Sequence, residues 1–395
     1  MKAASGMRNV ALLSGSQAML LSVSPTVITL TGLAGLALAP NRTLATLGVS
    51  FWVLGGLLAT FPASVHMKRV GRQRGLIHGA AVGIGGALLS AAALQIQSFW
   101  LLCLGALLFG AHHAVGQYYR FAAADSVPQE SKSTAISLVL AGGVLGGILG
   151  PTASRYFVDL LEPKYFAAFL SLIGFAVVSI LFLRFTHVDD PVADEHLGVS
   201  RPLSDIVAQP KFIVAALAAA AGNSVMIFLM TSAPLAMTHH GHAYGDAAMV
   251  VSWHVVGMFM PALFTGALIG RFGTLRIIVV GALINALGVG IGLSGTDVTQ
   301  FWWSLVLNGV GWNFLFVAST TLLTETYRPQ ERAKAQGLND LFMFTLTAIA
   351  SFSSGVIMTM SGWAVVNVAA LPFVLVALAA VWWLTRKHRE TSAHG

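Results

Sequence analysis

Long apolar segments, interrupted by short polar ones, follow one another along the whole chain. A transmembrane α-helix needs about 20 mostly apolar residues, and each segment meets that length. The pattern therefore predicts an all-α membrane protein with twelve transmembrane helices. The expected spans are residues 10–38, 43–66, 75–95, 98–122, 133–157, 164–185, 211–238, 246–269, 275–293, 300–323, 333–358 and 362–385.

The longest polar segment lies at residues 186–210 and carries several acidic side chains, among them Asp189 and Glu195. It divides the twelve predicted spans into six and six. We therefore expect an N-terminal six-helix half over 1–185, a linker over 186–210 and a C-terminal six-helix half over 211–395.

The composition agrees with a protein that is embedded in lipid. Of the 395 residues, 56% are hydrophobic and only 9% are charged, whereas a soluble domain carries roughly 25% charged residues. So little charge cannot cover the core of a soluble fold of this size. The composition thus excludes a soluble enzyme, a nucleic-acid-binding protein and a disordered chain, and the expected partner is the lipid bilayer rather than nucleic acid.

The positive charges predict the orientation of the chain in the membrane. There are 22 lysines and arginines. If both termini are cytoplasmic, all of them except Arg42, Arg155 and Lys164 fall in cytoplasmic segments or adjoining helix ends. Lysine and arginine accumulate on the cytoplasmic side of membrane proteins. We therefore expect a multi-pass protein with both termini in the cytoplasm.

Two polar loops in corresponding places of the two halves have similar sequences. Residues 64–74 and 266–276 each place an arginine two positions before a glycine, between the second and third spans of a half. Such repetition indicates two halves with internal symmetry. The loops resemble the signature of the major facilitator superfamily, although Lys68 and Gly270 occupy the position of its usual aspartate. The resemblance implies alternating access to a site near the middle of the membrane.

Several polar side chains lie within the predicted spans, where they are costly and commonly functional. We see no arrangement typical of an enzyme active site and expect neither catalysis nor a bound cofactor. The residues that we expect to line a central cavity are His112, His113, Gln117, Asn308, Trp312 and Asn313.

Methionine and histidine recur at helical spacing in the seventh and eighth spans. Met226 and Met230 are four residues apart, as are His254 and Met258, so each pair shares one helix face. Counted from His242 in the turn, Met230 and His254 are each 12 residues away, and Met226 and Met258 are each 16 residues away. If both faces point inward, three thioethers and one imidazole meet, a ligand set that favours copper.

The turn between these spans adds three histidines on the outer side of the membrane. His239, His240 and His242 could collect a metal ion ahead of the four-residue set. The plainer interpretation is a solvated loop, and methionine pairs are also common in apolar packing. His254 could equally be satisfied by Asn223 or a backbone carbonyl.

The combination of Met-x-x-x-Met in the seventh span and His-x-x-x-Met in the eighth resembles the CcoA-like family of bacterial copper importers. Residues 117–125 and 140–143 are also similar to that group. The resemblance implies a transporter of the bacterial inner membrane that imports copper as its substrate for assembly of cbb3-type cytochrome c oxidase. It assigns Met226, Met230, His254 and Met258 as copper ligands, and it implies a downstream copper chaperone or oxidase assembly factor as partner.

Two other functions compete with copper import. A related branch is associated with riboflavin, and the histidines of the fourth span, with Trp312 and its neighbouring asparagines, could bind such a ring by hydrogen bonding and stacking. The sequence Gly146-x-x-x-Gly150-Pro151 resembles a signature linked to exporters, which would fit drug export. Copper import is the leading expectation, with uptake of an organic nutrient such as riboflavin, or drug export, as alternatives.

Overall fold

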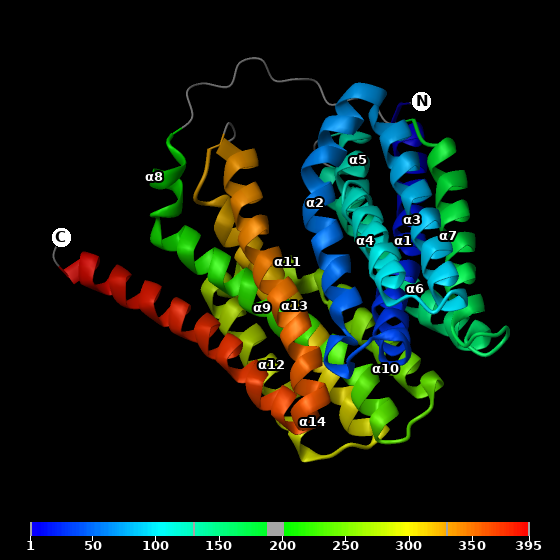
Figure 1. Ribbon diagram of the computed structural model, residues 1–395. Helices are drawn as coiled ribbons and strands as arrows, with labels where there is room; N and C mark the ends of the chain where they lie inside the picture. Colours follow the sequence, from blue (N-terminus) through cyan, green and yellow to red (C-terminus); the bar gives the residue numbers. More distant parts are fainter. Residues whose placement is uncertain (1, 129–130, 188–200, 329–330, 394–395) are drawn as a thin grey trace.

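The computed structural model describes residues 2–128, 131–187, 201–328 and 331–393, and all the regular elements within these ranges are helices. They form two bundles (Figure 1). The first bundle contains α1 (Lys2–Leu38), the short 3-10 helix η1 (Arg42–Leu44), α2 (Leu47–Val70), α3 (Arg72–Gln95), α4 (Phe99–Gly116), α5 (Tyr119–Asp125), α6 (Lys132–Phe157) and α7 (Phe166–Arg184).

The second bundle follows a polar connection that contains the short helix α8 (Leu203–Val207). Most of the predicted polar segment, residues 188–200, lies outside the described residues. The bundle itself contains α9 (Pro210–His239), α10 (Tyr244–Phe259), α11 (Ala262–Phe272), α12 (Thr274–Ser294), α13 (Val298–Thr324) and α14 (Arg332–Ala393).

The all-α membrane fold predicted from the sequence is confirmed. Within the described ranges, ten helices are long and apolar enough to cross a bilayer, and the bent pair α10 and α11 makes an eleventh span. The last of the ten, residues 334–387, reverses direction at Gly362, where φ is 81°, so it comprises two crossings (Figure 1). The described helices thus provide twelve crossings.

Two expected spans are interrupted rather than continuous. The span expected at 98–122 divides into α4 and α5 at Gln117 and Tyr118. The span expected at 246–269 divides at Met260 and Pro261 with a bend of 41°. Pro261 explains the second break, because a proline inside a helix removes a hydrogen bond and clashes with the preceding turn.

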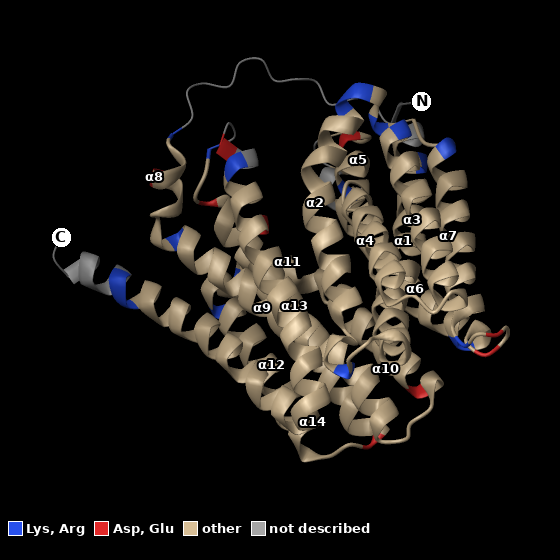
Figure 2. Ribbon diagram, viewed as in Figure 1, with Lys and Arg blue, Asp and Glu red and all other residues tan. Residues whose placement is uncertain are grey.

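The two bundles meet at one end and diverge at the other. At the end opposite the connection between bundles, the Ser154 hydroxyl lies 2.7 Å from that of Tyr244, and the Thr359 hydroxyl donates to the Arg42 carbonyl at 3.3 Å. Both contacts join one bundle to the other. Figure 1 shows the ribbons of the bundles separated at the end where α7 terminates and α8 lies, which we call the linker end. Most lysines and arginines gather there (Figure 2).

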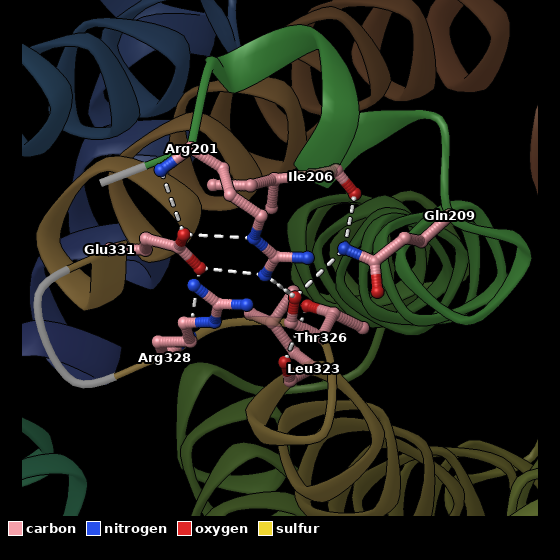
Figure 3. A network of polar contacts seen from close by, with 7 residues as sticks. All are labelled: Arg201, Ile206, Gln209, Leu323, Thr326, Arg328 and Glu331. Carbon is pink, nitrogen blue, oxygen red and sulfur yellow. Dashed lines mark hydrogen bonds and ion pairs between the residues drawn. The ribbon is translucent and has the colours of Figure 1, made fainter. Parts of the chain in front are cut away.

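A buried carboxylate ties the connection between bundles to the second bundle (Figure 3). Glu331 is fully buried, and its oxygens accept hydrogen bonds from the backbone N–H and guanidinium of Arg201 at 2.7–2.9 Å and from the backbone N–H of Arg328 at 2.9 Å. Hydrogen bonds from Arg201 hold the pKa of this carboxyl well below its usual range. The charge of Glu331 is therefore compensated, as a buried charge must be.

Candidate functional site

A polar cluster lies in the first bundle where α4 gives way to α5. Nδ1 of His113 is 2.8 Å from the Ser24 hydroxyl in α1, and Nε2 of His113 is 2.9 Å from Nε2 of Gln117. The amide nitrogen of Gln117 can only donate, so Nε2 of His113 must accept. The Ser24 hydroxyl donates to the Leu20 carbonyl at 3.2 Å, which leaves its oxygen to accept from Nδ1. This network assigns His113 as the neutral imidazole with its proton on Nδ1.

Trp52 in α2 completes this cluster. Its ring packs against that of His113 with centroids 4.9 Å apart. Gly55 in α2 and Gly110 in α4 make this contact possible, since neither position leaves room for a Cβ against the facing backbone. The indole N–H of Trp52 is buried with no hydrogen-bond partner among the described residues. The amide oxygen of Gln117 likewise accepts no hydrogen bond from the described residues, because the contact with His113 uses only the amide nitrogen. The cluster therefore offers one donor and one amide for a ligand.

An aromatic cluster lies in the second bundle. The rings of Trp312 and Phe316 in α13 stack with centroids 4.9 Å apart and planes inclined by 11°, and Phe259 meets Trp312 edge-on at 6.2 Å. The indole N–H of Trp312 donates to Asn223 in α9 at 3.1 Å, and the Asn223 amide donates to the sulfur of Met343 in α14 at 3.0 Å. These bonds fix the orientation of the indole, while Phe316 is only half-buried.

The two clusters occupy similar depths on helices that border the other bundle. They lie near the middle of the spans formed by α1, α4 with α5, α9 and α13. The Phe259 ring packs over Gly143 in α6 of the first bundle, and Trp52 packs against the apolar cluster formed mainly by α9 and its neighbours. The polar and aromatic clusters therefore flank the boundary between the bundles near the midplane.

Two opposite charges from different bundles lie toward the linker end of this boundary. Arg120 in α5 and Asp340 in α14 interact electrostatically, and Asp340 also accepts a hydrogen bond from the Asn339 amide at 3.2 Å. Nε of Arg120 is buried without a hydrogen-bond partner in the described part of the chain. The pair therefore provides charges of opposite sign on the two sides of the boundary.

The four predicted metal ligands belong to helices that α13 separates. The helix α10 packs mainly against α13, whereas α9 packs mainly against α14 and then against α13, and α9 and α10 have little contact with each other. The His254 imidazole is turned to α13, where Nδ1 donates to the Leu305 carbonyl at 2.7 Å. Met230 is buried in the apolar cluster around α9, and Met226 packs against that cluster. Nε2 of His254 is buried with no partner among the described side chains.

The three histidines of the outer turn point to separate surroundings. His239 and His240 are exposed, whereas His242 is half-buried and donates to the Thr296 carbonyl at 2.7 Å. The described residues contain no group of three or more His, Cys, Asp or Glu side chains placed to hold a metal ion.

The residues expected to line a cavity fall into two groups. His113, Gln117 and Trp312 belong to the two clusters at the boundary. The others make contacts within a bundle: His112 donates to the Gly79 carbonyl at 3.0 Å, Asn308 donates to Asn285 at 3.4 Å, and Asn313 donates to the Met258 carbonyl at 2.6 Å.

The sequence pattern alone does not indicate that Ser24, Trp52, Phe259, Phe316 or Met343 belong to the site. One signal was available: Phe316 follows Trp312 by four residues, the spacing that places two side chains on one helix face. Nothing local distinguishes Ser24 from the other serines and threonines of α1, most of which also bond to carbonyls of their own helix.

Comparison with known proteins places these features in a family. The model of the Major Facilitator Superfamily matches residues 10–259 and 212–395. The chain is 40% identical over 376 residues to the riboflavin transporter RfnT of Brucella anthropi, covering 94% of each protein. It is 27% identical over 368 residues to YddS of Bacillus subtilis, an uncharacterized MFS-type transporter, covering 89% of this chain and 84% of YddS.

Among solved structures, the chain is similar to a bacterial homolog of the human lysosomal transporter Spinster in an inward-facing and occupied conformation. The TM-score is 0.67 at 16% identity, covering 95% of this chain and 96% of the homolog. At this identity the likeness concerns the fold.

Proposed function

The chain belongs to the major facilitator superfamily and is a secondary transporter of that type, and we propose that it imports riboflavin or a closely related flavin across the bacterial inner membrane. The observation that carries the proposal is the presence of an aromatic stack in one bundle and an oriented amide in the other, both near the boundary between the bundles, in a chain 40% identical to a riboflavin transporter. The organic-nutrient alternative is thus favoured over copper import.

The aromatic cluster supports binding of a flat ring. The isoalloxazine of riboflavin is a planar three-ring system, and aromatic rings gain about 0.5–1.5 kcal/mol from stacked or edge-to-face pairing beyond the area they bury. Phe316 offers the accessible ring, while Trp312 behind it is held by Asn223. A platform fixed before binding loses little conformational entropy when the ligand arrives.

The polar cluster supports recognition of the other distinctive part of a flavin. One edge of the isoalloxazine is an imide, with an N–H between two carbonyl oxygens. A carboxamide side chain matches this edge, since its oxygen accepts from the N–H while its nitrogen donates to a carbonyl. Gln117 uses one amide hydrogen on His113 and keeps the other hydrogen and its oxygen for a ligand. The neutral His113 thereby sets the orientation of the amide.

The conformation supports release toward the linker end. The bundles are joined at the opposite end by Ser154 with Tyr244 and by Thr359 with the Arg42 carbonyl, and they diverge at the linker end (Figure 1). Lysines and arginines gather at the linker end (Figure 2), which supports a cytoplasmic location for that end. In this proposal the structure is the inward-facing state, and transport exchanges it with a state in which Arg120 and Asp340 draw together.

Copper remains a second candidate because of one observation. Nδ1 of His254 carries its hydrogen toward the Leu305 carbonyl, which leaves the lone pair of Nε2 free in a buried position, as in a metal-ligating imidazole. His112 shows the same pattern beside Gly79. A free imidazole nitrogen alone does not select copper, so flavin import is the stronger proposal.

Growth of a riboflavin-requiring bacterium that lacks its own importer tests the function. We expect the wild-type protein to restore growth at a low riboflavin concentration, and the Gln117→Ala variant to require about tenfold more vitamin. The Gln95→Ala variant, altered at a surface glutamine far from the boundary, should match the wild type. Failure of the wild type to restore growth, with the protein present in the membrane, contradicts the proposal.

A further inference from the structure

A groove lies between α6 and α10 at the end of the molecule opposite the linker end. It has a volume of about 190 Å³ and is lined by Ile148, Thr152 and Arg155 from α6 and by Met249 and Trp253 from α10, among others. Its two walls belong to different bundles. Just behind the groove the bundles are in close contact. Gly147 of α6 permits this contact, since a Cβ at that position would clash with Val255 of α10.

The rim of the groove is apolar and faces outward. The exposed fractions are 45% for Ile148, 76% for Tyr156 and 47% for Trp253. Exposed residues of α6 form a row along one face of the helix, with spacings of seven, three and four residues. The row consists of Leu138, Leu145, Ile148 and Thr152. In a membrane-spanning helix such a row faces lipid, so acyl chains cover the rim.

A cation without a counter-ion stands at the outer end of the groove. Arg155 is exposed, and the described part of the chain provides no ion pair or hydrogen bond for its guanidinium. Its Nε lies close over Gly245, where a Cβ would be only 2.7 Å away. The exposed Thr152 hydroxyl, one helix turn earlier, adds a donor.

Charged side chains that follow Arg155 on α6 or flank Gly245 on α10 have partners of their own. Lys164 pairs with Asp159 at 3.4 Å. Asp246, in the first turn of α10, accepts from the Ala243 backbone N–H at 3.2 Å and so caps its own helix. Among the described residues that line the groove, Arg155 is the one charged side chain, and it is available for a ligand.

We propose that this groove binds a phospholipid, with the phosphate on Arg155 and Thr152 and one acyl chain along Ile148, Met249 and Trp253. The groove and a phospholipid are chemically complementary. A guanidinium binds phosphate oxygens through paired hydrogen bonds, and the apolar rim packs against an acyl chain. Because the lipid touches both α6 and α10, it stabilises the conformation in which the bundles meet at this end. The proposal does not depend on the identity of the transported substrate.

Native mass spectrometry of the full-length protein titrated with phosphatidylglycerol tests the site. The Arg155→Gln variant removes the phosphate ligand, and Thr152→Trp fills the groove while keeping the cation. We expect each to weaken binding of the tightest lipid at least about fivefold, which is what one cation contributes at a membrane surface. Arg42→Gln, a cation at the same end but outside the groove, should bind lipid as the wild type does.

Folding and anion chemistry are controlled separately. Each variant must elute as the wild type does in size-exclusion chromatography and keep its Tm in lipid-free detergent, and a variant that fails is replaced by Arg155→Met or Thr152→Phe. Equal lipid affinity for wild type and Arg155→Gln overturns the proposal, as does an equal loss in Arg42→Gln. Displacement of the lipid by excess inorganic phosphate would show a site for free anions and would also overturn it.

Discussion

Nε2 of Gln117 lies 2.9 Å from Nε2 of His113, and this contact is a hydrogen bond only while that ring nitrogen carries no proton. The relationship makes the amide of Gln117 an oriented group rather than a freely rotating one. The Gln117 amide keeps one N–H donor and its oxygen acceptor for a ligand. These two groups complement the carbonyl oxygen and the N–H of an imide edge.

Removing the Gln117 amide should impair recognition of the imide selectively. Each neutral hydrogen bond contributes about 0.5–1.5 kcal/mol, so the loss of two in Gln117→Ala should raise the KM for riboflavin roughly tenfold. A riboflavin analogue methylated at the imide nitrogen should be a poor substrate for the wild type. The measurement is uptake of both compounds by both proteins.

The comparison of the two compounds separates recognition from a general defect. In the Gln117→Ala variant the methylated analogue and riboflavin should be taken up equally, because the group that distinguishes them is gone. If the variant still discriminates between them as the wild type does, Gln117 does not read the imide.

Removing the Phe316 ring should weaken binding through loss of stacking. For Phe316→Ala we expect an affinity lower by about 1 kcal/mol, or roughly fivefold, whereas Phe316→Tyr should retain binding. Flavin fluorescence, which stacking on an aromatic ring quenches, reports the binding in detergent. Phe272→Ala, an exposed phenylalanine at the end of α11, serves as the control. Unquenched flavin bound to the wild type would argue against the aromatic platform.

Arg120 and Asp340 should act as one unit during transport. Either single neutralisation, Arg120→Gln or Asp340→Asn, leaves the other charge uncompensated when the linker end closes, so each should slow transport severalfold. The double variant should be no slower than the worse single variant, since interacting residues are not additive. Counterflow of riboflavin measures the rate. Strictly additive losses would show that the two charges act independently.

The buried carboxylate of Glu331 should make the stability of the folded protein depend on pH. Its pKa is depressed in the folded protein by hydrogen bonds from Arg201, so the stability it provides is present above the ordinary carboxyl pKa of 4.5 and is lost as the pH falls toward the folded value. Glu331→Gln should lower the Tm at neutral pH, and the difference from the wild type should shrink as the pH falls below that value.

A matched variant isolates the effect of burial. Glu325 pairs with Lys211 at 2.6 Å, but both side chains are about 40% exposed. Exposed pairs contribute little, so Glu325→Gln should change the Tm only slightly at any of these pH values. A Tm difference for Glu331→Gln that is the same at every pH would contradict the role assigned to this carboxylate.

Most of the fold follows from the sequence because a bilayer leaves the backbone few choices. An apolar segment of about 20 residues in lipid must satisfy its hydrogen bonds internally, which makes a helix nearly obligatory. The breaks are harder to predict. Pro261 indicates one of them. The break after Gln117 has no proline, and the packing of His113 beside it against Trp52 of α2 is a tertiary contact that the local sequence does not specify.

The site was less predictable because neighbours in sequence need not pack together. Depth matching placed His254 opposite Met230 on the assumption that the seventh and eighth spans face each other, whereas α13 lies against both. Trp312 and His113 were expected at a central site from their polarity in apolar spans. Trp52 was not, since only the contact through Gly55 and Gly110 brings its ring to His113.

Uptake by proteoliposomes that contain only this protein decides what it carries. Radiolabelled riboflavin and radiolabelled copper would be offered side by side to vesicles with the wild type and with Gln117→Ala. Flavin import predicts that riboflavin accumulates with the wild type and far less with the variant, while copper stays at the level of empty vesicles. Accumulation of copper without riboflavin would contradict flavin import. It would instead favour copper import, with Met226, Met230, His254 and Met258 as the candidate ligands.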